Sequence, residues 1–117
     1  MRHLKKGRNF GRTRDQRRAL LRNLLFELIM RERVVTGEAK AKELSPLIEK
    51  MVTRARAGTV AARRRLAQRL PRPAVAKLVA TLAPRFAKRP GGYTRIVKLG
   101  PRKSDGARQA IIEFIKE

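Results

Sequence analysis

Positive charge is the feature that most constrains how this chain can fold. Its 117 residues include 31 Lys and Arg but only 9 Asp and Glu, which gives a formal net charge of +22. A compact body with this charge repels itself unless an anion neutralises part of it. The sequence therefore predicts a polyanionic partner before any motif is considered.

The apolar residues are enough for one modest core. They make up 42% of the chain, but aromatic residues make up only 4%, so we expect a core of Leu, Ile, Val and Ala. A chain of this length buries about two-thirds of its unfolded surface. We expect a basic arm over residues 1–14, followed by a single domain over residues 15–117.

The residues needed for most kinds of catalysis are missing. The chain has no cysteine and one histidine, which excludes thiolate zinc sites and cysteine nucleophiles. His3 has no acid beside it, and the glycine segments GRNFG and PGG lack the lysine and spacing of a phosphate loop. We therefore expect no enzyme, no metal, no cofactor and no small-molecule substrate.

The sequence shows neither a signal peptide nor a membrane span. The amino terminus is charged and lacks a following apolar run, and the most apolar stretch, LLFELIM, is short and contains Glu27. We expect a soluble, intracellular protein.

Hydrophobic spacing predicts four helices. The first covers about residues 15–32, with Thr13 or Asp15 as its cap, and its Phe26 and Met30 suggest that it is the most enclosed helix. The second runs from about 37 to Gly58, with a kink or a restart expected at Pro46. The third is TVAARRRLAQRL, with Thr59 as its cap, and the fourth runs from about 73 and stops at Pro84.

The β-rich segments predict three strands. RVVTG follows the first helix, and YTRIVKL and RQAIIEFI flank a turn segment, GPRKSDGA, as in a hairpin. Residues 107–116 also fit an amphipathic helix, although we favour the strand. Since the early strand must pair with the hairpin or expose its edge, we predict a two-layer α+β fold in the order α-β-α-α-α-β-β.

The distribution of charge favours RNA as the polyanion. Basic residues lie on the arm, on a helix and on the hairpin, and no helix-turn-helix, zinc finger or basic zipper is present. Folded RNA suits such a spread because phosphate and shape contacts dominate its recognition. Arg63 and Arg64, in the Arg63–65 triplet, either contact phosphate or remain solvated.

The segment RPGGYTRI, residues 89–96, is predicted both to form a corner of the chain and to bind RNA. Gly91 and Gly92 permit unusual backbone angles or close approach of RNA. Arg89 and Arg95 are expected to contact phosphate. The charged neighbours of Tyr93 argue against its burial, and it either stacks on a base or covers the hairpin edge.

Four segments together resemble a known family. MRHLKKGRNFGRTRDQRRALLRNL, AKAKEL, RRRLA and PRFAKRPGGYTRIVKLGPR are similar to the bacterial large-subunit ribosomal protein seventeen family. The resemblance spans nearly the whole chain. It implies a non-catalytic constituent of the cytoplasmic ribosome that binds the large-subunit rRNA near the exit of the nascent chain, beside neighbouring ribosomal proteins.

The resemblance also implies which residues contact rRNA. The first set belongs to the arm and the start of the first helix: Arg2, His3, Lys5, Lys6, Arg8, Arg12, Arg14, Arg17, Arg18 and Arg22. The second set lies in the late loop: Arg89, Tyr93, Thr94 and Arg95.

Two other functional classes remain open at this stage. A DNA-compacting or free RNA-binding regulatory protein would share the charge but not the ribosomal motifs. An RNA-modifying enzyme would need a catalytic constellation, and we find none in the sequence.

Overall fold

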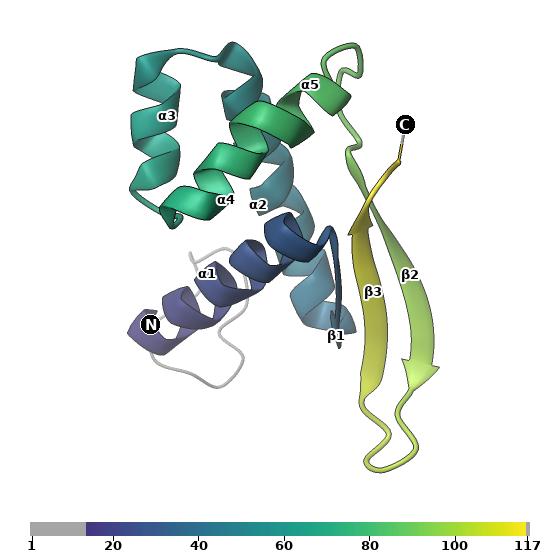
Figure 1. Cartoon of the computed structure of the whole chain (residues 1–117). Coiled ribbons are helices and arrows are strands. Elements are labelled where there is room, and N and C mark those ends of the chain that lie inside the picture. The colour runs from purple at the N-terminus through teal and green to yellow at the C-terminus, as the bar shows by residue number, and fades with distance from the viewer. Residues whose placement is uncertain (1–13, 117) are drawn as a thin grey trace, which may run out of the picture.

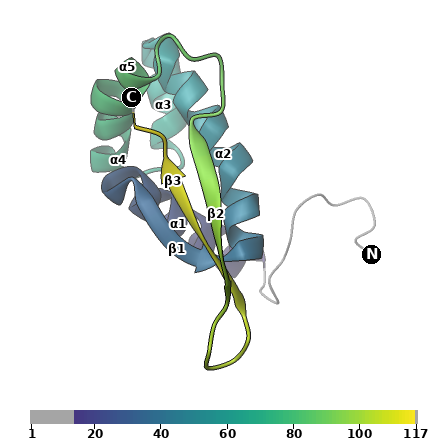
Figure 2. The ribbon, with the colours of Figure 1, turned by 90° about the vertical axis from the view of Figure 1, so that its right-hand side faces the viewer.

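The predicted two-layer α+β fold is confirmed. The computed structural model describes residues 14–116, and residues 1–13 and 117 lie outside the described part. The predictions for Arg2, His3, Lys5, Lys6, Arg8 and Arg12 therefore fall on residues about which the structure says nothing. Helices cover one face of a small sheet, and the other face is left uncovered by them (Figures 1 and 2).

The two longest helices are α1, Arg14–Arg31, and α2, Glu38–Ala57. Asp15 stands inside the first turn of α1, so it is not the cap, and Thr13 lies outside the described residues. The more enclosed helix is α2 rather than α1, because Met30 is exposed and Phe26 is only partly buried. The buried residues of α2 are Ala41, Leu44, Ile48, Met51, Val52 and Ala55.

The restart expected at Pro46 is absent, since α2 continues through this residue. A proline removes one internal hydrogen bond, but helices before and after it can be held by tertiary packing. Leu44 and Ile48, on either side of Pro46, are both fully buried. The predicted end of the helix is confirmed, because Gly58 adopts φ +66° and its N–H donates to the carbonyl of Ala55.

The remaining helical segments form a hairpin beside α2. Helix α3 is Val60–Ala67, and the hydroxyl of Thr59 accepts from the N–H of Ala62 at 3.1 Å, as the cap prediction requires. After it come α4, Arg72–Lys77, the π-helix η1, Leu78–Leu82, and α5, Ala83–Arg85.

The predicted stop at Pro84 is wrong, because the helical path continues to Arg85. The N–H of Ala83 donates to the carbonyl of Leu78, five residues earlier, which is the π-helical pattern. Pro84 then stands in the first turn of α5, directly after η1, and its ring nitrogen has no N–H with which to continue this pattern.

The sheet has the order β1-β3-β2, with both pairs antiparallel. Its strands are β1, Arg33–Gly37, β2, Thr94–Pro101, and β3, Arg108–Phe114. The early strand pairs with the hairpin as predicted. The alternative helix over residues 107–116 is wrong, because β3 is the central strand and its alternate residues Ala110, Ile112 and Phe114 are buried.

The core is not purely aliphatic. Phe86, Tyr93 and Phe114 join the Leu, Ile, Val and Ala residues in one buried cluster. The ring centroids of Phe86 and Tyr93 are 5.1 Å apart, and those of Phe86 and Phe114 are 6.1 Å apart. These aromatic residues fill the space between the end of α5 and the sheet, so the few aromatic residues are used where two layers meet.

Glu32 ties the end of α1 to the rest of the molecule. It has a φ of +67°, which is unusual for a residue with a side chain. The N–H of Phe114 donates to its carbonyl at 2.9 Å. Its carboxylate pairs with the guanidinium of Arg85 and, at 3.2 Å, with the ammonium of Lys77. The hydrogen bond from Arg85 is the main reason that the pKa of Glu32 lies below its ordinary value of 4.5, and Lys77 adds to it.

Replacing Glu32 by Gln should lower the free energy of unfolding by about 1–3 kcal/mol near neutral pH, the usual worth of hydrogen bonds to a charged group. A carboxylate with a lowered folded-state pKa stabilises the fold above its unfolded pKa and loses this effect as the pH falls through the folded pKa. The gap between the parent and Glu32→Gln should therefore close below about pH 4.5.

The measurement is denaturant unfolding at a series of pH values. Glu27→Gln is the matched control, because Glu27 is exposed on the same region of α1. A gap between parent and Glu32→Gln that stays constant from pH 7 to strongly acidic solution would contradict the prediction.

Candidate nucleic-acid interface

A basic groove brings together arginines from distant parts of the chain. Arg17, Arg18 and Arg22 come from the first half of α1, and Arg69 comes from the turn after α3. The groove measures about 460 Å³, and its apolar lining is Leu21, Leu25, Leu47 and Met51. Cations around a low-dielectric floor concentrate the electric field, which favours a phosphate group.

One acid reduces the positive charge of this groove. Glu43 on α2 lines it, and its Oε1 accepts a hydrogen bond from Nη2 of Arg17 at 2.8 Å. This ion pair fixes the start of α1 against the middle of α2. Arg18, Arg22 and Arg69 are exposed, so three cations of the groove face solvent beside the fixed pair.

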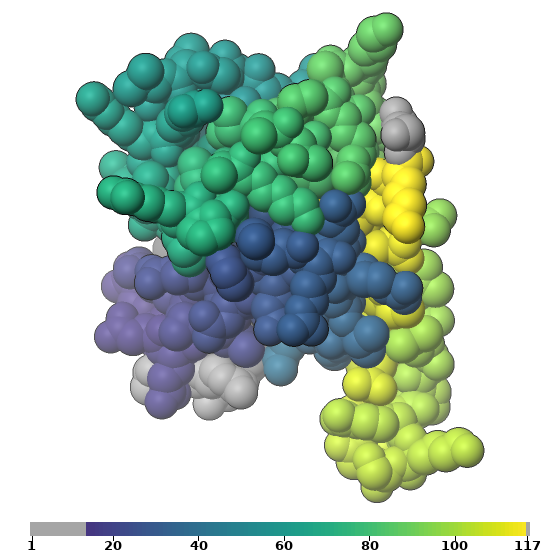
Figure 3. Space-filling model, in the orientation of Figure 1, coloured from purple at the N-terminus to yellow at the C-terminus, as the bar shows by residue number. Residues whose placement is uncertain are grey.

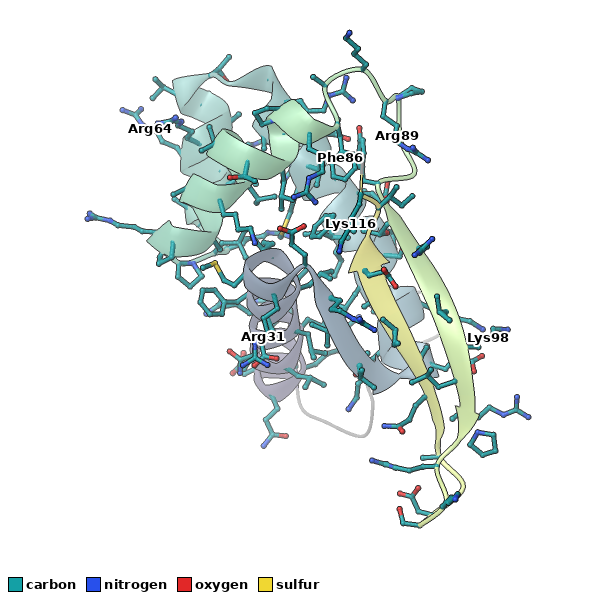
Figure 4. The ribbon with its side chains drawn as sticks, turned by 45° about the vertical axis from the view of Figure 1, so that its right-hand side comes forward. Arg31, Arg64, Phe86, Arg89, Lys98 and Lys116 are labelled. Carbon is teal, nitrogen blue, oxygen red and sulfur yellow. The ribbon has the colours of Figure 1, made fainter. Side chains whose placement is uncertain are left out.

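Sequence reasoning missed Arg69. It follows the Arg63–65 triplet in a basic run, and helical periodicity alone does not show that it approaches α1. Arg63 and Arg64 are exposed as predicted, but they line a different groove, between α3 and the segment α4–η1. Arg64 points outward from α3 (Figure 4). The structure therefore does not bring the triplet and Arg17 into one site.

The late loop, residues 86–94, lies at the end of the molecule away from α1 (Figures 1 and 2). Its backbone N–H groups bind the carboxylate of Glu49, a residue of α2. Both carboxylate oxygens of Glu49 accept from the loop: Oε1 accepts the N–H of Gly92 at 3.0 Å, and Oε2 accepts those of Tyr93 at 2.9 Å and Thr94 at 3.0 Å. The hydroxyl of Thr94 also donates to Oε2 at 3.0 Å.

From the sequence alone, Glu49 and the lysines of the same helix are expected to form ordinary surface ion pairs, whereas the structure gives this acid to the loop. Successive N–H groups in a tight turn make a concave site for anions. In this protein the anion is an internal carboxylate from α2. Gly92 supplies the required backbone, with φ +64°. The loop is a corner, as predicted, and it is held from the inside.

A second α2 residue holds the same loop. Nη1 of Arg56 donates at 2.7 Å both to the carbonyl of Arg89 and to the hydroxyl of Tyr93, and Nη2 donates to the carbonyl of Ala87 at 2.8 Å. One guanidinium therefore satisfies three acceptors on the loop. This role follows from the fixed, forked donors of arginine, which lysine does not share.

The expectation that charged neighbours keep Tyr93 out of the core is wrong. Only 1% of Tyr93 is exposed, and its ring packs against Phe86. The charge beside it is used to satisfy its hydroxyl, through Arg56. In this conformation its ring has no face to offer a base.

Arg89 and Arg95, the two arginines of this region expected to contact phosphate, have different surroundings. Nε of Arg89 donates back to the carbonyls of Gly91 and Gly92, at 3.2 and 3.0 Å. Arg95, on β2, reaches Glu113 at 3.4 Å, and 64% of its side chain is exposed. A side chain added at Gly91 would meet nothing within 4 Å, so the space outside this corner is open.

The hairpin tip is a further basic surface, in keeping with the charge that the sequence places on the hairpin. It projects beyond the helices (Figures 1 and 3) and exposes Arg102, Lys103 and Arg108. Asp105 braces it by accepting from the N–H of Ala107 at 3.0 Å and from Nε and Nη2 of Arg102. The Ala107 hydrogen bond is the main cause of the lowered pKa of Asp105, followed by Arg102.

Two other kinds of site are absent from the described residues. Among residues 14–116, no three His, Cys, Asp or Glu side chains gather as a metal would require. Within the same range, no helix has the length and apolar character needed to cross a membrane. The site is a set of basic surfaces on a rigid scaffold.

Replacing Glu49 by Gln should loosen the late loop. Gln retains one oxygen acceptor where the carboxylate uses two, so about 1–3 kcal/mol of charge-assisted hydrogen bonding should be lost. Amide hydrogen exchange should become faster at Gly92, Tyr93 and Thr94, while the amides of β3 that pair with β1 keep their protection. Lys50→Gln, at an exposed neighbouring position, is the control. Unchanged protection at residues 92–94 would exclude this role for Glu49.

Sequence comparisons relate this chain to known proteins. The family model described as "Ribosomal protein L17" matches residues 20–115. A "Large ribosomal subunit protein bL17" from Gemmatimonas aurantiaca is 54% identical, over 98% of both chains. Proteins of the same name from Shouchella clausii and Thermomicrobium roseum are 53% and 51% identical, over 90% and 98% of this chain and 95% and 99% of the relatives.

Proposed function

Because this chain belongs to the ribosomal protein L17 family, we propose that it is a structural constituent of the large ribosomal subunit and binds the large-subunit rRNA. Proteins of this family are not enzymes, and the bacterial ribosome that they belong to is cytoplasmic. The observation that carries the rRNA proposal is the groove in which Arg17, Arg18, Arg22 and Arg69 converge from two elements.

The proposed contacts extend in both directions from this groove. Residues 1–13 lead directly into α1, and their cations Arg2, Lys5, Lys6, Arg8 and Arg12, with His3 and Arg14, would follow the same RNA. We propose that residues 15–117 act as one domain that presents this basic arm. Phosphate contacts and released counterions would offset the cost of ordering the arm.

Arginines outside the groove would contact other rRNA segments. Arg63, Arg64 and Arg89 do not line the groove, which suits an RNA that also contacts other parts of the protein. Arg95 is set apart from this group, because it lies on the outer sheet face and pairs with Glu113. The open space beside Gly91 and Gly92 would admit a phosphate backbone. Tyr93 and Thr94 would act indirectly, by holding the loop in shape.

The proposal places the chain near the polypeptide exit region, beside other large-subunit proteins. The family resemblance is its support for this position. A DNA-compacting or free RNA-binding regulatory protein is the competing class. Cosedimentation of the chain with purified large subunits through a high-salt wash separates the two, because a loosely held protein dissociates as salt competes for phosphate.

The groove can be tested with a triple variant. Replacing Arg18, Arg22 and Arg69 by Ala should weaken binding to large-subunit rRNA and reduce the slope of log K against log salt by about 2–3, close to one for each lost phosphate contact. Filter binding over a series of salt concentrations measures this slope, and circular dichroism checks that the fold is intact.

A control variant removes the same charge elsewhere. Arg31, Lys42 and Lys116 are exposed and do not line the groove, so replacing these three by Ala should change the slope much less. If both triple variants change the slope equally, the binding depends on total charge and the groove has no special part in it.

A further inference from the structure

One face of the sheet carries an aliphatic row that the helices do not cover. Val35 on β1 pairs with Ile111 on β3, and Ile111 pairs with Val97 on β2, so the three residues form a line across all strands. Val35 is 54% exposed and Val97 is 41% exposed, while Ile111 is partly buried. Figure 2 shows this face toward the viewer, with the helices behind the strands.

This row departs from the usual chemistry of a two-layer fold. An antiparallel sheet with one face on the core normally has polar residues on its solvent face. The inner face is apolar, as expected for a face on the core, because Val34, Ile112 and Phe114 are buried on it. Leu99, in the bulge next to Val97, is 51% exposed and extends the aliphatic surface at one end. Such a contiguous surface marks an interaction site.

A cationic margin lies next to the aliphatic row. The neighbouring register positions are Arg33 on β1, Glu113 on β3 and Arg95 on β2. Both arginines are exposed, whereas Glu113 is mostly covered and already pairs with Arg95 at 3.4 Å. This margin therefore presents positive charge beside the aliphatic row.

The chemistry of the row distinguishes its occupant. Aliphatic side chains offer RNA no hydrogen bond and no ring for stacking, and the aromatic residues Phe86, Tyr93 and Phe114 are inside the core. A second copy of this chain would bring another +22 charge against the same cations. A different protein, with aliphatic side chains beside carboxylates, complements both parts of the surface.

We propose that this outer sheet face, formed by Val35, Ile111 and Val97 with Arg33 and Arg95 at its margin, docks another protein of the large subunit. The partner presents aliphatic residues to the row and Asp or Glu to the two arginines. The inference rests on the proposed function. The basic groove of α1 and α2 lies on the helical side, so rRNA and this partner bind at the same time (Figure 1).

Photo-crosslinking in assembled subunits tests the proposal. The full chain carries benzoylphenylalanine at position 97, is incorporated into large subunits in cells, and is irradiated after the subunits are purified. We expect a crosslink to one other protein, at a peptide that contains Asp or Glu. Position 60 is the matched control, because Val60 is a 64% exposed valine on α3. It should not crosslink to that peptide.

The outcomes separate this inference from the function on which it rests. Normal cosedimentation of the chain with a crosslink to rRNA, to a second copy, to a peptide without acids or to nothing overturns the docking proposal alone. A chain that does not cosediment overturns both. If the position 97 variant is not incorporated while the parent is, the same probe at position 35 decides.

The charge component has its own readout. The double variant Arg33→Glu and Arg95→Glu, carrying the probe at position 97, should reduce the yield of the protein crosslink at least several-fold, while cosedimentation is retained. An unchanged yield would mean that the partner does not place Asp or Glu against these two arginines, and it would overturn the partner chemistry as stated.

Discussion

The surplus of positive charge is the constraint on which this structure depends. With 31 cations and 9 acids, the fold cannot balance its surface, and three of its acids, Glu32, Glu43 and Glu49, instead join elements that are far apart in the chain. Glu32 connects the α1–β1 junction to Arg85 and Lys77, and Glu43 connects α2 to Arg17. Pairs that are partly shielded from water interact more strongly than exposed ones. The few acids therefore stabilise the fold, and most cations remain at the surface.

The helix α2 is the element through which these connections act. It packs against α1, α3, η1, α5 and all three strands, and two of its polar residues organise the late loop from inside. The carboxylate of Glu49 accepts hydrogen bonds from backbone N–H groups of the loop, and the guanidinium of Arg56 donates to two of its carbonyls. A loop held in this way loses little conformational freedom when it meets a ligand, which lowers the entropic cost of binding.

The two layers also separate two kinds of surface. Arginines gather around an apolar-floored groove on the helical side, and aliphatic residues cross the uncovered face of the sheet. A nucleic acid and an apolar protein surface require opposite chemistry, so a chain that presents both on different faces can lie between them. This division follows from the fold, because one sheet face covers the core and the helices leave the other uncovered (Figure 2).

Local patterns in the sequence were sufficient for the order of elements, the Thr59 cap, the Gly58 stop and the family, because each depends on residues that are close along the chain. Residues 107–116 satisfied both a helical and a strand pattern, and pairing of β3 with β1 and β2 decided between them. Tertiary structure alone also buried Tyr93, brought Arg69 to α1 and gave Glu49 to the late loop. Glu49 and the late loop, like Arg69 and α1, are more than 40 positions apart in the chain, and no local spacing contains the geometry of such contacts.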